Sequence, residues 1–159
     1  MKRDKPLAAD AEKQVKRFID KFEPKLQLLI RSVRRALRKR LPTAHELVYD
    51  NYNFFVIGYS ATERPSDAIV SIAAGANGVS LCFLYGARLP DPTRTLRGSG
   101  NQTRFIRLES ARVLSHREVE MLIRAAVAKS NAPFRAAGTR NVIIRSVSAK
   151  QRPRRRAME

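Results

Sequence analysis

The apolar pattern of the chain changes its period at Pro42. Before Pro42, apolar residues recur every three or four positions, first at Val15, Phe18, Ile19 and Phe22 and then at Leu26, Leu29, Ile30, Val33 and Leu37. This spacing predicts two helices, one from near Ala8 to near Glu23 and one that begins at Pro24. After Pro42 the chain carries short β-branched and aromatic segments with polar corners between them, a pattern that is typical of strands.

Five segments after Pro42 have the composition of strands. They are residues 45–50, 53–59, 68–74, 79–85 and 104–109. Asn77-Gly78 separates the third from the fourth and predicts a tight hairpin, because both residues tolerate positive φ angles. A long loop at 86–103 precedes the fifth strand, and a capping box at 115–118 predicts a last helix that buries Val119, Leu122, Ile123, Ala126 and Val127.

The length of 159 residues predicts one domain, which we place at residues 1–131, followed by a basic, largely extended and partly mobile tail at 132–159. No apolar stretch is long enough for a signal-peptide core or a membrane span, so we expect a cytoplasmic protein without membrane association. The single cysteine, Cys82, excludes a disulfide within the chain and a four-cysteine metal site. The sequence does not predict an oligomeric state.

The formal net charge of +18 is the outlying feature of the composition. The excess of Lys and Arg is concentrated at the two ends, in residues 1–41 and 132–159, whereas residues 42–85 carry more acids than bases. Most of the excess charge therefore lies outside the predicted sheet. A basic balance of this kind favours polyanionic partners.

The order of these elements, together with two short motifs, resembles the bacterial YdhG/YdeI-like domain family over roughly residues 15–127. The motifs are Leu41-Pro42-Thr43-Ala44-His45-Glu46 after the second helix and the glycine-rich stretch Leu96-Arg97-Gly98-Ser99-Gly100-Asn101-Gln102-Thr103-Arg104 before a strand. The resemblance implies an α+β fold in which an antiparallel sheet of about five strands is backed by two N-terminal helices and one C-terminal helix. Neither motif is a catalytic signature, and the role of most family members is unassigned.

Some members of that family have been proposed to act as frataxin-like iron chaperones, and this is one alternative for the present chain. Iron would be the cofactor only in that case, and we otherwise expect none. Hard cations prefer oxygen ligands. Here the acids of the first helices are interspersed with lysines and arginines, so their surface repels Fe²⁺ at long range.

The favoured hypothesis is a non-enzymatic binding protein with weak affinity for polyanions such as nucleic acid. Its candidate contacts are arginines on the flank of the second helix and in the tail, and dense basic runs of this kind attract phosphate backbones. They are Arg31, Arg34, Arg35, Arg38, Arg152, Arg154, Arg155 and Arg156. This hypothesis requires that the arginines gather on one face and are not neutralised by carboxylates.

The glycine-rich loop is a candidate anion site, since glycines can turn backbone N–H groups inward beside arginine charges. Its residues are Arg97, Gly98, Gly100, Gln102, Thr103 and Arg104. It lacks the Gly-Lys-Ser/Thr ending of a nucleotide-binding P-loop and leads into a strand, so a plain structural turn is the alternative.

A second alternative function is a small-molecule binder or enzyme that uses a pocket between this loop and the sheet, with Tyr49, Phe54 and Tyr85 as candidate lining. Core packing is the competing interpretation of these aromatic rings. A lone Cys82 between apolar strand residues indicates an inert thiol, and two distant histidines offer no metal-ligand spacing. We therefore expect no catalytic residue.

Overall fold

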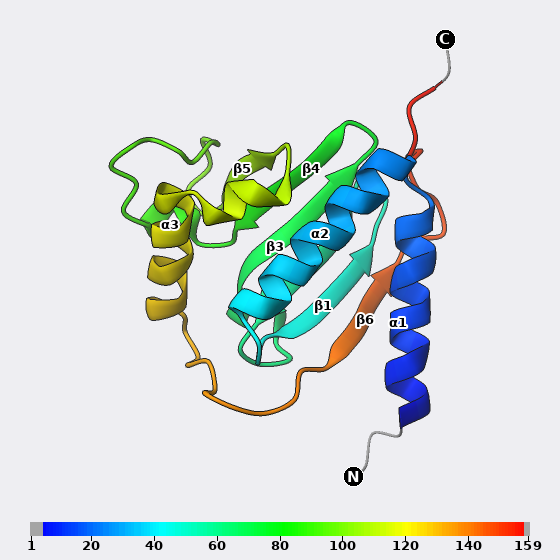
Figure 1. Ribbon diagram of the computed structural model, residues 1–159, viewed down its shortest axis with the longest axis horizontal. Coiled ribbons are helices and arrows are strands. Elements are labelled where there is room, and N and C mark those ends of the chain that lie inside the picture. Colours follow the sequence, from blue (N-terminus) through cyan, green and yellow to red (C-terminus); the bar gives the residue numbers. More distant parts are fainter. Residues whose placement is uncertain (1–4, 158–159) are drawn as a thin grey trace.

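The computed structural model describes the backbone of residues 5–157 and the side chains of residues 9–157. Its centre is a six-stranded sheet with the order β5-β4-β3-β2-β1-β6. The strands are β1 (His45–Asp50), β2 (Phe55–Ser60), β3 (Ala68–Gly75), β4 (Gly78–Phe83), β5 (Arg104–Leu108) and β6 (Val142–Val147). The helices α1 (Lys5–Asp20), α2 (Pro24–Arg40) and α3 (Arg117–Ala128) lie on one face of the sheet (Figure 1). The α+β fold with three helices is confirmed, but the third helix is not C-terminal, because β6 follows it.

The two N-terminal helices pack with the predicted apolar stripes toward the sheet. Val15, Phe18 and Ile19 of α1 are buried, and Phe22 follows in the turn before α2. The ring of Phe55 on β2 lies 5.9 Å from that of Phe18 and 6.2 Å from that of Phe22, measured between centroids. Aromatic burial of this kind fixes α1 and the start of α2 against the centre of the sheet.

The hairpin between β3 and β4 is present, with its turn one residue earlier than predicted. Gly75 pairs with Gly78, so the two connecting residues are Ala76 and Asn77. Gly78 has a φ of 141°, and a Cβ at this position would lie 2.3 Å from Nη2 of Arg107. Glycine is therefore needed at 78 for its backbone angle, and its lack of a side chain leaves room for the guanidinium group of Arg107.

The predicted tail differs most from the structure. Residues 142–147 form β6, which pairs in parallel with β1, so the sheet is mixed and has six strands where an antiparallel sheet of about five was expected. Val142 and Ile144 pack against the core. This apolar, β-branched segment fills an edge of the sheet, and the predicted boundary at residue 131 therefore falls within one folded unit. Residues 158–159 of the predicted tail and residues 1–4 lie outside the described part of the chain.

Candidate functional site

The arginines of α2 do not form the free basic flank that was predicted. Arg34 and Arg38 turn toward the sheet, and Nη2 of each lies within hydrogen-bond distance of Oε1 of Glu46 on β1, at 3.0 Å and 2.5 Å. Both also contact Glu12 of α1. Arg31 pairs with Asp20 at 2.7 Å. The helical period indicated the side of α2 on which these arginines lie, but not that α1 and β1 would place carboxylates there.

Glu46 is the centre of this ionic network. Its side chain is fully buried, and the hydroxyl group of Tyr59 donates a further hydrogen bond of 2.8 Å to Oε2. Burial raises the pKa of the Glu46 carboxyl, but the hydrogen bonds from Arg34 and Arg38 outweigh burial and hold that pKa below its ordinary value. The charges of the two arginines and the two carboxylates compensate each other, so the network leaves little charge for a ligand. Its contacts also join α1, α2 and β1.

Asp50, at the other end of β1, binds the C-terminal segment to the sheet. It accepts hydrogen bonds from Nζ of Lys21 at 2.7 Å and from Nη2 of Arg154 at 2.9 Å. Arg154 is only 5% exposed and also donates to the carbonyl oxygen of Asn51. Arg154 is therefore buried and paired with Asp50, and it does not lie on the exposed basic surface that was predicted to contact a polyanion.

A groove of about 470 Å³ lies between α1 and α2, above the Glu46 network. Lys13, Lys16 and Arg35 line it and are exposed. Lys16 pairs with Asp20 across one helical turn, and Glu12 also lines the groove. The groove is therefore lined by one carboxylate and six basic side chains. Four of these, Lys16, Arg31, Arg34 and Arg38, pair with carboxylates, and the exposed Lys13 and Arg35 contribute the remaining positive charge.

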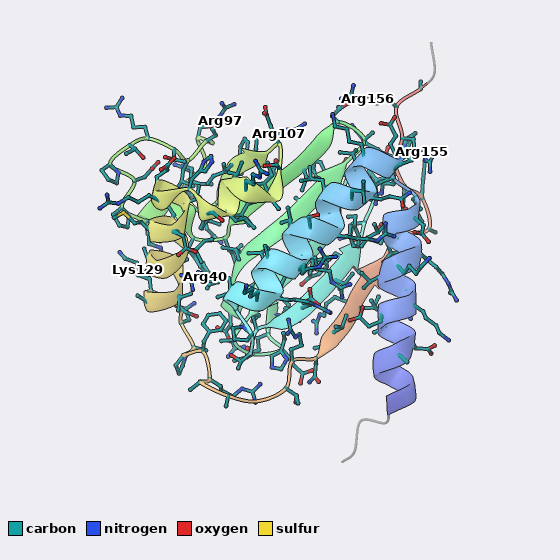
Figure 2. All side chains as sticks on the ribbon, viewed as in Figure 1. Arg40, Arg97, Arg107, Lys129, Arg155 and Arg156 are labelled. Carbon is teal, nitrogen blue, oxygen red and sulfur yellow. The ribbon has the colours of Figure 1, made fainter. Side chains whose placement is uncertain are left out.

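The other arginines predicted to contact a polyanion line a cleft of about 480 Å³ at the end of the sheet where β3 turns into β4. They are Arg152, Arg155 and Arg156. We call this surface the arginine–aromatic cleft and define it by Phe54, Arg107, Arg152, Arg155 and Arg156. Its floor is the β3–β4 turn, and one wall is the segment that follows β6. Figure 2 shows Arg107 on β5 on one side of this turn, with Arg155 and Arg156 on the other. No carboxylate lines the cleft among the residues that the structure describes.

Two aromatic rings stand exposed beside these arginines. Phe54 is 52% exposed and rests on Gly75, where an added Cβ would lie 3.3 Å from the ring. Tyr52 is 42% exposed, and the guanidinium carbon of Arg152 lies 5.7 Å from the centre of its ring. Both rings come from the corner between β1 and β2, which a hydrogen bond from Asn51 N to Phe54 O closes. The corner therefore presents apolar ring faces next to positive charge.

Arg107 was not predicted as a site residue, although a signal was present. On β5 the buried Ile106 and Leu108 alternate with Phe105 and Arg107, so the sequence already placed Arg107 on the face away from the core. Its Nη2 hydrogen-bonds to the carbonyl oxygen of Asn77 in the hairpin turn. This contact fixes the guanidinium at the mouth of the arginine–aromatic cleft.

Carbonyl oxygens of the glycine-rich loop accept hydrogen bonds from the side chain of Arg104, which belongs to the same predicted anion site. Nη1 of Arg104 donates to the carbonyl oxygens of Gly100 and Thr103, and the hydroxyl group of Thr103 donates to Leu84 O. A two-way backbone bridge joins Arg97 to Phe105, and Gly98, with a φ of 117°, makes the bend between them. The loop residues Gly98, Gly100 and Gln102 are exposed. These contacts support the alternative of a structural turn.

The predicted pocket residues lie apart. Tyr49 alternates with the inward-facing Val48 and Asp50 and so belongs to the other face of β1. Phe54 lines the arginine–aromatic cleft, whereas Tyr85 lines a smaller cavity at the far end of the sheet. The three residues therefore do not form one pocket.

A comparison of the chain with protein-family models, with curated proteins and with solved structures finds no match. The resemblance to the YdhG/YdeI-like family therefore stays a prediction.

Three further observations concern metal ligands, membrane spans and the single cysteine. Within residues 5–157, no cluster of three or more His, Cys, Asp or Glu side chains is placed to hold a metal ion. In the same part of the chain, no helix combines the length and the apolar character that crossing a bilayer requires. Burial raises the pKa of the Cys82 thiol, so this cysteine carries no sign of an activated nucleophile.

Proposed function

We propose that this protein binds single-stranded nucleic acid, with tolerance for sequence, at the arginine–aromatic cleft. The observation that carries the proposal is the meeting of four guanidinium groups and two exposed rings at one corner that no carboxylate lines within the described residues. Proteins that bind single strands combine a positive groove for the backbone with ring faces on which bases stack. The cleft offers both features within one surface.

The charges in the cleft are suited to phosphate contacts. Arg152, Arg155 and Arg156 are exposed, and none of them pairs with a carboxylate in the part of the chain that the structure describes. Arg155 is held by a hydrogen bond from its Nε to the carbonyl oxygen of Lys21, which leaves its terminal amino groups for a ligand. Arginine binds phosphate oxygens in pairs through this fork.

The position of the rings favours single strands over duplexes. Phe54 and Tyr52 present their faces at a corner of the sheet, and the bases of a single strand can unstack and lie on such faces. In a duplex the base faces are occupied by their neighbours, so only the phosphate contacts remain. The network at Glu46 and the arginine of the glycine-rich loop take no part in this proposal.

The test measures the anisotropy of a fluorescent oligonucleotide of about 12 nucleotides, a length within the usual site size. Binding is expected at about 50 mM salt and should weaken by more than roughly tenfold at about 200 mM, because each phosphate contact releases condensed counterions. The triple substitution Arg152→Ala, Arg155→Ala and Arg156→Ala should abolish most of this affinity and flatten the salt dependence. A duplex of the same length should bind more weakly.

The matched control is the triple substitution Arg94→Ala, Arg112→Ala and Arg117→Ala, which removes the same charge from exposed arginines outside the cleft. It should retain nearly all of the affinity. Equal losses in the two triple variants would show that net charge, and not the cleft, attracts the oligonucleotide. No binding at low salt by the parent chain would end the proposal.

Stacking is tested separately from charge with Phe54→Ala. Loss of one stacked base is expected to cost about 1–3 kcal/mol of binding free energy with little change in the salt dependence. Phe54→Tyr keeps the ring face and should retain the affinity. If Phe54→Ala binds the single strand as the parent does, the cleft binds phosphate groups alone.

A further inference from the structure

The smaller cavity that Tyr85 lines lies at the opposite end of the sheet from the arginine–aromatic cleft, and its volume is about 280 Å³. It is enclosed by the ends of β3 and β4, by the turn that follows β4 and by the C-terminal end of α3. The side chains of Ile69, Phe83, Leu89 and Ala126 form its apolar part. Figure 2 shows Lys129 at this end of the molecule, far from Arg155 and Arg156.

The rim of this cavity is polar and positively charged. Arg88, Lys129, Ser130 and Asn131 line it, and no acidic residue does so among the residues that the structure describes. An apolar cavity with a few convergent polar groups is the usual form of a small-molecule site. A ligand that matches this cavity has an apolar body for the interior and a negatively charged group for the rim.

The two cations are held in place before any ligand binds. The guanidinium carbon of Arg88 lies 5.0 Å from the centre of the Tyr85 ring, and the Tyr85 hydroxyl donates to Ser66 O at 2.7 Å, which fixes the ring. Nζ of Lys129 donates to the carbonyl oxygen of Arg88 at 3.3 Å. Stacking leaves the edge of the guanidinium free to bind a carboxylate through two hydrogen bonds.

The end of α3 does not oppose a negative ligand strongly. The backbone N–H of Lys129 donates to Ala125 O, and that of Ser130 donates to Val127 O, so two of the last carbonyl groups have partners. The charge of Lys129 lies at the same helix end, where it offsets the negative end of the helix dipole.

We propose that this cavity binds a small amphipathic monocarboxylate, with its apolar body among Ile69, Phe83 and Ala126 and its carboxylate between Arg88 and Lys129. The volume is at the lower limit for ligand pockets, so the ligand has roughly ten non-hydrogen atoms. This inference does not depend on nucleic-acid binding, because the two sites share no residue.

Isothermal titration with octanoate, 3-phenylpropanoate and 1-octanol tests the proposal on the full chain. At least one of the two carboxylates should bind with one-to-one stoichiometry, and preference between them distinguishes an aliphatic from an aromatic ligand. Octanol lacks the charge and should bind at least tenfold more weakly than octanoate. Equal binding of octanol and octanoate, or no binding of either carboxylate, would overturn the proposal.

Two variants locate the site. The double substitution Arg88→Ala and Lys129→Ala removes the rim charges from exposed positions and should weaken carboxylate binding at least tenfold. Its control, Arg94→Ala with Arg124→Ala, removes the same charge from exposed positions outside the cavity and should leave binding unchanged. Ala126→Phe fills the interior and should abolish binding. Unchanged affinity in the rim variant would refute the assignment, whether or not Ala126→Phe folds.

Discussion

Replacement of Glu46 by alanine is expected to lower the free energy of unfolding by about 3–5 kcal/mol, the usual cost of removing one partner from a buried ion pair. Arg34 and Arg38 would each lose a carboxylate that is fully buried, and Tyr59 would lose its hydrogen-bond acceptor. Glu12 alone would then face two guanidinium groups. Urea unfolding followed by circular dichroism measures the change.

The control for this prediction is Tyr59→Phe, which removes one hydrogen bond to Glu46 and leaves both arginine contacts intact. It is expected to cost about 1.5–3 kcal/mol, the range for a hydrogen bond to a charged group. A loss below about 1 kcal/mol in Glu46→Ala would show that Glu12 compensates both arginines, and would exclude Glu46 as the residue that holds α2 to β1.

The two buried carboxylates of β1, Glu46 and Asp50, make stability depend on pH in a defined direction. Burial raises the pKa values of Glu46 and Asp50, but their cationic partners outweigh burial and hold both pKa values below the ordinary ones. The unfolded chain therefore takes up protons first as the pH falls. Stability should be constant above about pH 6 and decline below about pH 4.5, as the pH drops toward the folded-state pKa values. Glu46→Gln should decline less steeply, and an unchanged slope in that variant would contradict the assignment.

The sequence alone predicted the elements whose pattern lies within a short stretch of the chain, namely α1, α2 and the β3–β4 hairpin. The apolar residues of α1 and α2 lie three or four positions apart, and a helix brings them to one face whatever else the chain does. The hairpin of β3 and β4 depends on the turn at Ala76 and Asn77, directly before Gly78, and on alternation in the two adjoining strands, so it too could be found within a short window.

The sequence was insufficient where partners lie far apart in the chain. Val142-Ile143-Ile144 was recognised as apolar, but β2 to β5 and α3 separate it in the chain from its partner β1. Parallel pairing also leaves no turn signal between the two strands. The fate of the arginines depends on the same distant contacts. Arg34 and Arg154 are neutralised by carboxylates of β1, whereas Arg152 and Arg155, in the same basic run as Arg154, remain exposed.

The sequence of β1 contains one signal for the buried carboxylates. Glu46 and Asp50 flank Val48 at intervals of two along β1, so all three side chains point to the same face of the sheet. A strand that directs both an apolar and two acidic residues toward the core requires cations opposite them. The arginines of α2 supply that charge to Glu46, whereas Lys21 and Arg154 supply it to Asp50, so the role of these cations is structural.

Replacement of Arg154 by alanine is expected to lower the free energy of unfolding by about 3 kcal/mol, because it removes a buried partner from the fully buried Asp50. Lys21 would remain as the only cationic partner of that carboxylate in the described part of the chain. The matched variant Arg155→Ala removes the same charge one residue later from an exposed position and should change stability by no more than about 0.5 kcal/mol.

Hydrogen exchange separates a local role of Arg154 from a global one. Two backbone hydrogen bonds hold the segment beyond β6 to the β1–β2 corner, from Ser148 N to Asp50 O and from Arg152 N to Tyr52 O. If Arg154 fastens this segment, Arg154→Ala should lower the protection of these two amides more than that of the amides in β3. The same variant should weaken oligonucleotide binding, since Arg152 is positioned by this segment, although Arg154 itself is buried and cannot contact a phosphate. Equal stability and equal protection in Arg154→Ala and Arg155→Ala would mean that the C-terminal segment is held by β6 alone, and the cleft would then lose the contact that fixes one of its walls.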